Sequence, residues 1–203
     1  MSEEKVNYYE NFEEIEKKLW GLLKEAVKDR NSEFRTPAFI CGDNKDLDGR
    51  IVVLRKVDPK NNFIQFHSDI RSSKIKQIKK NPNCSVLFYG KKEKIQLRLK
   101  VECEINFKNK ITKESWEKTG HISRKCYLVN KDPGSITEKP TSGLNDRFDN
   151  FGFTKEESEA GYNNFSVIKC NIKSIEWLYL AAKGHRRALI DFESIKKFTW
   201  LVP

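Results

Sequence analysis

The stretch Arg50-Ile-Val-Val-Leu-Arg55 decides the fold, because its β-branched and large apolar residues are the strongest strand signal in the chain. We expect one strand over residues 51–57, ended by a polar turn at 58–62. A second strand signal at 63–67 follows, so the two segments predict an antiparallel hairpin. The arginines at the strand ends can reach an anion, or they can form solvated salt bridges at a sheet edge.

Outward from this hairpin, further strand signals recur at spacings typical of antiparallel sheets. They cover residues 36–41, 85–89, 95–105, 165–170, 175–181, 187–192 and 198–202. Helical periodicity marks 11–30, 72–80, 111–129 and 154–160, and proline and glycine mark 131–150 as a loop. The connections are too short for βαβ crossovers, so we expect an α+β fold with an antiparallel barrel and peripheral helices.

The composition bounds the class of protein. The 203 residues include 39 Lys and Arg against 29 Asp and Glu, a formal net charge of +10 that raises the question of an anionic partner. Thirteen Phe, six Tyr and four Trp exclude a disordered chain. No apolar run approaches the roughly 20 residues that span a bilayer, and residues 1–5 lack the apolar region of a secretory signal. We therefore expect a cytoplasmic protein with no membrane segment.

Cysteine and histidine give no metal signature. The five cysteines are an odd set without CxxC spacing, so reduced and mostly buried thiols are expected. The three histidines lie far apart in sequence and belong to no HExxH motif, and no metal is predicted. The chain also lacks the glycine-rich nucleotide motifs and the GxSxG motif of hydrolases.

A candidate phosphate site lies at 66–74, Phe-His-Ser-Asp-Ile-Arg-Ser-Ser-Lys. Here a strand ends and a helix begins, and the free N–H groups of a helix start favour anions. Serine hydroxyls, Arg71 and Lys74 add hydrogen-bond donors and positive charge. A lysine in the first helical turn opposes the helix dipole, which favours an anion site over a plain serine cap with solvated lysines.

Two further segments carry polar or aromatic residues suited to a planar ligand. Gln96 lies between apolar residues on a strand and can both donate to and accept from the edge of a heterocycle, although an outward-facing solvated amide explains it equally well. The aromatic segment 175–179 precedes the basic segment 184–189. Together they can stack on and neutralise a planar anion, whereas core packing is the simpler explanation for Trp177.

Four motifs, taken in order, resemble one family. They are Arg-x-Val-x-Leu-Arg, His-Ser-Asp-x-Arg-Ser-x-Lys, Gln-Leu-Arg, and Trp with His-x-Arg. They are similar to the FMN-binding split barrel of pyridoxamine 5′-phosphate oxidase-like proteins, closely over residues 34–105 and more loosely to residue 203. The resemblance implies an antiparallel six-stranded split β-barrel with peripheral helices, formed by residues 1–203 as a single domain. The N-terminal helix would cover 11–30 and the barrel about 34–203. It also implies a homodimer with FMN at the interface.

The resemblance assigns roles by position. Residues that would hold FMN are Arg50, Ile51, Val52, Val53, Leu54, Arg55, His67, Ser68, Arg71, Ser73, Lys74, Gln96, Trp177 and Arg187. Trp177 and Arg187 would come from the partner subunit, with Ser135 as a weaker candidate. Arg55, Lys183 and His185 would contact a phosphorylated small-molecule substrate, and His185 and Arg187 would act in catalysis. The implied reaction is oxidation of pyridoxamine or pyridoxine 5′-phosphate to pyridoxal 5′-phosphate with O2.

Departures from the family pattern keep two alternatives open. The oxidase strand ends in Lys where this one ends in Arg55, and the Tyr, Arg and Ser that grip the substrate phosphate have no convincing counterparts in Trp116, Ser123 and Arg124. The chain is therefore either an FMN-dependent oxidase or an FMN-binding module or reductase without vitamin B6 oxidase activity. Binding of nucleic acid or of an anionic surface rests only on the net charge, because no nucleic-acid motif is present, and is not predicted.

Overall fold

The computed structural model describes residues 9–42, 46–145, 148 and 152–203. Its described strands form one antiparallel sheet of nine, in the order β2-β1-β5-β6-β7-β4-β3, with β8 on β7 and β9 on β8. The strand bounds are β1 Ala38–Gly42, β2 Leu47–Ile51, β3 Leu54–Asp58, β4 Phe63–Asp69, β5 Asn83–Gly90, β6 Ile95–Phe107, β7 Phe165–Tyr179, β8 Arg186–Asp191 and β9 Lys197–Leu201. The predicted α+β class with an antiparallel sheet is confirmed, and the sheet has nine described strands, against the six of the barrel that the resemblance implied.

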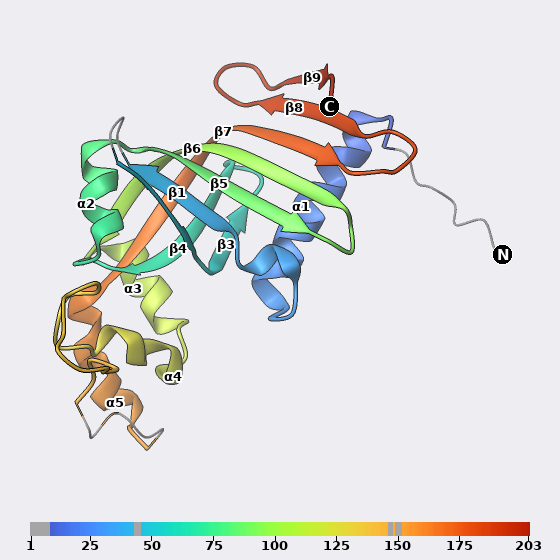
Figure 1. Ribbon diagram of the computed structural model, residues 1–203. Helices are drawn as coiled ribbons and strands as arrows, with labels where there is room; N and C mark the ends of the chain where they lie inside the picture. The colour runs from blue at the N-terminus through green and yellow to red at the C-terminus, as the bar shows by residue number, and fades with distance from the viewer. Residues whose placement is uncertain (1–8, 43–45, 146–147, 149–151) are drawn as a thin grey trace.

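The deciding stretch divides into two strands instead of forming one. β2 pairs with β1 and β3 pairs with β4, and these two edges of the sheet order are joined by only Val52 and Val53. Because so short a link joins opposite edges, the sheet must curl back toward itself (Figure 1). No ladder between β2 and β3 is present among the described residues, so the barrel is split at this point.

Other strand and helix boundaries also differ from expectation. The segments 165–170 and 175–181 belong to one 15-residue strand, β7, which pairs with β4, β6 and β8. The predicted helix at 111–129 consists of α3 Lys110–Glu117, α4 His121–Arg124 and η2 Lys125–Tyr127, with a break at Gly120. Glycine disfavours a helix interior, which explains the break.

The N-terminal helix agrees with its prediction. α1 spans Phe12–Lys28 and begins where the Asn11 side chain accepts hydrogen bonds from the backbone N–H groups of Glu13 and Glu14, at 2.7 and 3.4 Å. Its apolar face, which includes Ile15, Leu19 and Leu23, is fully buried against the sheet. Figure 1 shows α1 on one face of the sheet, while the opposite face of β1, β5 and β6 carries no helix.

The helices between β6 and β7 form a separate layer below the barrel (Figure 1). They comprise α3, α4 and η2, followed by α5 Lys155–Ser158 and η4 Glu159–Asn164. A second apolar cluster of Trp116, Tyr127, Phe165 and Val167 fixes this layer to β7. Elsewhere, α2 Ser73–Lys80 packs on β1 and β6, and η1 Glu33–Arg35 follows α1.

Two further observations bear on the sequence predictions. All five cysteines are free, four are buried and Cys126 is exposed. None of the helices in the described part of the chain is long and apolar enough to cross a membrane.

Candidate functional site

The first candidate site lies at the start of α2, where two buried serines meet a lysine. The hydroxyls of Ser68 and Ser72 lie 3.0 Å apart, and Lys74 Nζ donates to both at 3.3 Å. Within the described ranges, Lys74 has no carboxylate as a salt-bridge partner. Burial lowers the pKa of its ammonium, and the neighbouring charge of Arg50 lowers the pKa further. A partly desolvated cation beside two hydroxyls favours an anion.

Arg50 completes this group from β2. Its guanidinium donates to the Oε1 of Gln77 at 3.0 Å and to the Sγ of Cys41 at 2.7 Å, and it also pairs with Asp48. Gln77 lies one helical turn after Lys74 on α2, so strand and helix hold the two cations near one another. We call Arg50, Ser68, Ser72 and Lys74 the α2 cluster.

Arg71 and Ser73 do not join the α2 cluster in the way the sequence suggested. The guanidinium of Arg71 pairs with buried Asp69, with an Nη2–Oδ2 distance of 2.7 Å, and donates to the backbone carbonyl of Val129 at 3.0 Å. Asp132 lies 3.6 Å away on the same loop. Arg71 thus ties the loop after η2 to the end of β4. Ser73 is the exposed first residue of α2.

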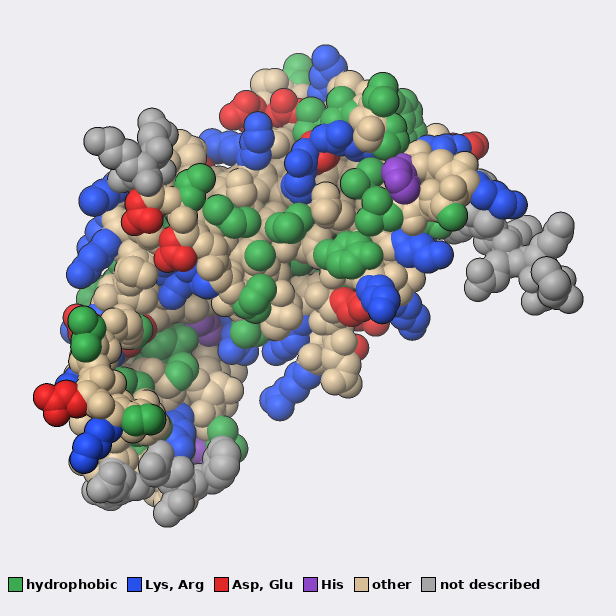
Figure 2. All heavy atoms as spheres, in the orientation of Figure 1, with side chains coloured by type: hydrophobic (Ala, Val, Ile, Leu, Met, Phe, Trp, Pro, Cys, Tyr) green, Lys and Arg blue, Asp and Glu red, His purple; other side chains and the backbone are tan. Residues whose placement is uncertain are grey.

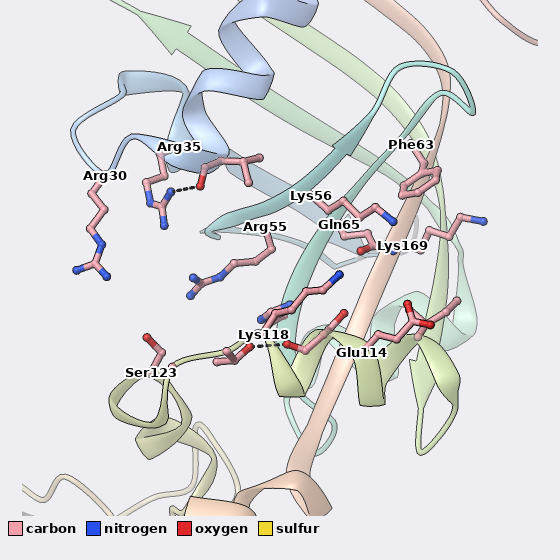
Figure 3. A pocket seen from close by; sticks show the side chains of 16 residues that line it. Arg30, Arg35, Arg55, Lys56, Phe63, Gln65, Glu114, Lys118, Ser123 and Lys169 are labelled. Atoms are coloured by element: carbon pink, nitrogen blue, oxygen red, sulfur yellow. Dashed lines mark hydrogen bonds between the residues drawn. The ribbon is translucent and has the colours of Figure 1, made fainter. Parts of the chain in front are cut away.

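The second candidate site is a trough of about 690 Å³ between the outer side of β3 and β4 and the helix α3 (Figure 3). A β-bulge shapes it. Leu54 pairs with Phe66, but the next residue in register, Lys56, pairs with Gln65, so Arg55 is an extra residue in β3. Because of the bulge, Arg55 and Lys56 both line the trough although they are adjacent in sequence.

The trough is strongly cationic. The cations that line it are Arg30, Arg35, Arg55, Lys56, Lys118 and Lys169. Among its described lining residues, Glu114 is the one carboxylate. Burial lowers the pKa of Arg55, whose buried Nε has no hydrogen-bond partner. Burial and the charge of Arg55 lower the pKa of His67 to about 3, so His67 is neutral at pH 7. A cleft lined by one sign of charge attracts ligands of the opposite sign.

The third group of predicted residues lies on the outer face of the sheet. Gln96 pairs with Leu178 on β7, and Leu178 pairs with Arg187 on β8, so the side chains of Gln96 and Arg187 belong to one row across the sheet. Arg187 Nη2 lies 3.0 Å from Glu176 Oε1, and its buried Nε has no partner. This row can meet the polar edge of a heterocycle.

Trp177 points to the opposite side of the same strand. It pairs with Leu97, lies in the core at 0% exposure and meets Tyr9 edge-on at 5.0 Å between ring centres. The structure therefore does not bring Trp177 together with Gln96 and Arg187 within one chain. Of the apolar residues between the two arginines, Val52 and Leu54 are buried in the core, whereas Ile51 is 65% exposed at the end of β2.

Lys183 and His185 lie in the exposed turn between β7 and β8. The Nδ1 of His185 accepts the backbone N–H of Ala181 at 3.1 Å, which holds the ring in place and leaves Nε2 as the free ring nitrogen. Ser135 donates to the carbonyl of Asp132 at 2.7 Å within the exposed loop. Among the three possible substrate-phosphate residues after β6, Ser123 lines the trough, while Trp116 and Arg124 are buried together below it.

The α2 cluster and the outer-face row are well separated in one chain. Arg50 of the cluster contacts Cys41 on β1. Strand pairing from β1 through β5 to β6 places Cys41 at about the same height in the sheet as Val101 of β6. Gln96 lies five residues earlier on β6, roughly 17 Å away at the usual rise of a strand. Within one chain, the α2 cluster and the outer-face row can therefore contact opposite ends of an elongated ligand, but they cannot contact the same chemical group of it.

Comparison with known proteins shows a similarity over part of the chain. Residues 18–106 match the model of the pyridoxamine 5′-phosphate oxidase FMN-binding domain. Over this segment the chain is similar to the pyridoxamine 5′-phosphate oxidase-like FMN-binding proteins. The matched segment of this family contains Arg50, Ser68, Lys74 and Gln96, which carried the resemblance in the sequence. No curated protein matched the chain.

Solved structures agree on the split-barrel fold. The chain is similar to a pyridoxamine 5′-phosphate oxidase-related, FMN-binding protein from Nostoc punctiforme, with a TM-score of 0.70 and 17% identity, over 90% of this chain and 96% of that chain. PhzG from Burkholderia lata, solved with tetrahydrophenazine-1-carboxylic acid, gives 0.68 and 13%, over 92% and 90%. ChuZ from Campylobacter jejuni gives 0.54 and 13%, over 96% and 65%.

Sequence reasoning missed several residues that the fold brings to these sites. Gln77 supports the α2 cluster by accepting a hydrogen bond from Arg50, and Gln65 and Lys169 line the trough. A buried polar residue inside the apolar run Phe-Ile-Gln-Phe was a usable signal for Gln65. Lys169 could not be found this way, because only strand register places it beside β4.

Proposed function

We propose that the chain binds FMN with its phosphate at the α2 cluster. The observation that carries this proposal is Lys74, a partly buried ammonium that meets two serine hydroxyls and has no carboxylate partner among the described residues. A phosphate would accept hydrogen bonds from Lys74, Ser68 and Ser72 and from the nearby guanidinium of Arg50. The hydroxyls of Ser68 and Ser72 donate to the backbone carbonyl of Asp69 at 3.2 and 2.8 Å, and they would turn from it to a bound phosphate. Every group of the set can then donate, which fits a phosphate dianion.

The polar edge of the flavin is assigned to the outer-face row of Gln96 and Arg187. Gln96 can donate and accept, and Arg187 has an unpartnered buried Nε that can donate. A guanidinium near the N1–C2 edge would favour the reduced, anionic flavin. Trp177 would contribute only through packing behind this row, because it lies in the core.

A homodimer follows from the same geometry as part of the proposal. The outer face of the sheet carries apolar residues without a helix over them, including Leu87, Tyr89 at 49% exposure and Leu189 (Figure 2). Such a face is suited to a second copy of the chain. Pairing of two copies would let the α2 cluster of one and the row of the other contact the same flavin at the interface.

The trough beside Arg55 is assigned to a phosphorylated small-molecule substrate, and the chain to the FMN-dependent oxidoreductases. When bound, FMN would accept a hydride equivalent from the substrate. Arg55 would hold the substrate phosphate, and neutral His67 would line the wall without adding charge. Lys183 and His185 do not line the trough, because their turn follows Tyr179, ten residues along β7 from Lys169. In the homodimer they would contact the substrate held by the other subunit, with His185 fixed through Nδ1. Oxidation of pyridoxamine or pyridoxine 5′-phosphate with O2 is the specific reaction that the family resemblance favours.

A second candidate function is FMN binding, or reduction of another small molecule, without vitamin B6 oxidase activity. The placement of Arg124 favours it. This arginine is 1% exposed, lies 4.4 Å from the Trp116 ring and pairs with Glu159, so it is committed to the helical layer and does not reach the trough.

One experiment separates these functions. The purified protein is examined for flavin absorbance and then assayed for pyridoxal 5′-phosphate formation from pyridoxamine 5′-phosphate and O2. Yellow protein with turnover supports the oxidase, and yellow protein without turnover supports the second function. Colourless protein that takes up no added FMN would refute both.

A further inference from the structure

The end of the trough away from Arg55 holds a second group of anion-binding side chains. Lys56, Gln65 and Lys169 are paired in register across β3, β4 and β7, so they form one row on the outer side of the sheet. The ammonium groups of Lys56 and Lys169 each lie 5.1 Å from the ring centre of Phe63. The two Nζ atoms are therefore at most about 10 Å apart, with the Gln65 amide between their strands (Figure 3).

Gln65 also indicates that this end of the trough binds a ligand. Its side chain is 5% exposed and lines the trough, and it makes no side-chain hydrogen bond to the described part of the chain. Its amide is therefore available to donate an N–H bond to a ligand in the trough. Lys169 meets Glu104 only at 3.7 Å near solvent, which leaves most of its charge uncompensated.

The two cationic ends are separated by a short, fixed distance. Arg55 and His67 mark one end, and the row through Gln65 marks the other. Gln65 and His67 lie two residues apart on β4, roughly 7 Å at the rise of a strand. A volume of about 690 Å³ is enough for a small organic molecule that reaches both ends. Six cations against one carboxylate exceed what a single phosphate neutralises.

We propose that the trough takes an elongated small molecule with an anionic group at each end, a phosphate at Arg55 and a carboxylate or second phosphate at the Lys56–Gln65–Lys169 row. This inference rests on the proposed function, because it specifies the substrate class of that site. The row orients the substrate along β4, and the bulge at Arg55 lets two neighbouring residues serve the two ends.

The test uses two rigid probes on the FMN-saturated protein. Phenyl phosphate has one anionic end, and 4-carboxyphenyl phosphate has two. Isothermal titration should show about tenfold tighter binding of the second probe, the effect of one additional charge-assisted contact. In a Lys56→Met/Lys169→Met variant the preference should fall to within twofold, while the affinity for phenyl phosphate stays nearly unchanged.

The matched control removes two lysines of the same kind outside the trough. Lys108 and Lys196 lie 5.4 and 5.3 Å from the rings of Phe107 and Phe198, so Lys108→Met/Lys196→Met lowers the net charge equally. This control should retain the preference. Equal binding of the two probes by the wild-type protein, or an unchanged preference in Lys56→Met/Lys169→Met, would overturn the inference. Loss of FMN binding alone would refute the proposed function, and the same titration on the colourless protein would still decide the trough.

Discussion

Replacing Lys74 by methionine tests whether the α2 cluster is a phosphate site or a structural cap. The change keeps the length and packing of the side chain and removes its charge. Lys74 makes only two long hydrogen bonds, of 3.3 Å, to the hydroxyls of Ser68 and Ser72. It has no ion pair within the described residues, so its removal should cost the protein without FMN little or no stability.

The expected loss is therefore in cofactor binding. A charge-assisted hydrogen bond contributes about 1.5–3 kcal/mol, which corresponds to roughly 10- to 100-fold in affinity. Titration of the protein without FMN, followed by quenching of flavin fluorescence, measures this change directly. Urea unfolding of the same samples should show a midpoint equal to or higher than that of the wild type, because an unpaired and partly buried ammonium is removed.

The matched control is Lys76→Met, an exposed lysine on the same helix. It should leave FMN affinity within twofold. A Lys74→Met protein that binds FMN as tightly as the wild type would refute the phosphate assignment. A protein that loses stability as well as FMN would show that Lys74 serves the fold of α2, and the reasoning from its missing partner would fail.

The remaining predictions concern pH, the helical layer and assembly. Because the pKa of His67 is about 3 when folded, the unfolded chain binds more protons below pH 6.5, and stability should fall by up to about 4 kcal/mol toward pH 3. Urea unfolding between pH 4 and 6.5 should give a flatter profile for His67→Phe, whereas His121→Phe, whose exposed ring also meets a phenylalanine edge-on, should keep the wild-type slope. Arg124→Met should lower the unfolding free energy by about 2–4 kcal/mol, because it leaves the carbonyl of Thr119 without its side-chain donor and removes one of the donors to the carbonyl of Trp116; an unchanged urea midpoint would contradict the buried network. Light scattering should show a dimer for the wild type and a monomer for Tyr89→Glu, while Ile136→Glu, at a loop residue that is 97% exposed, should remain dimeric; a dimeric Tyr89→Glu would exclude this face.

Features set by neighbouring residues could be predicted from the sequence. The 3.6-residue spacing of apolar residues and the Asn11 cap identified α1, and the turn at 58–62 identified the hairpin of β3 and β4. The serine-rich start of α2 indicated that Lys74 lies beside serine hydroxyls, as it does in the α2 cluster. In each case the physical cause, a periodic face, a cap or a turn, lies within a few residues of the feature.

Features set by distant pairing could not be predicted. Residues 51–57 look like one strand, but Ile51 pairs with Ala38 while Lys56 pairs with Gln65, and only the identity of those partners shows the break. Arg71 looked free for a phosphate, yet it pairs with Asp69 and reaches Val129, 58 residues away. The side of the sheet on which Trp177 lies follows from its pairing with Leu97, which alternation within one segment does not specify.

The bulge at Arg55 explains why the alternation of residues along the strand did not predict that both Arg55 and Lys56 line the trough. Regular alternation would place Leu54 and Lys56 on the core side and Arg55 alone on the outer side. The extra residue keeps Leu54 paired with Phe66 in the core and returns Lys56 to the outer side beside Gln65. The core keeps its leucine, and the trough gains a second cation from the same strand. The β-bulge, which cannot be recognised from the sequence pattern, is therefore the feature that places a cation from β3 at each end of the trough.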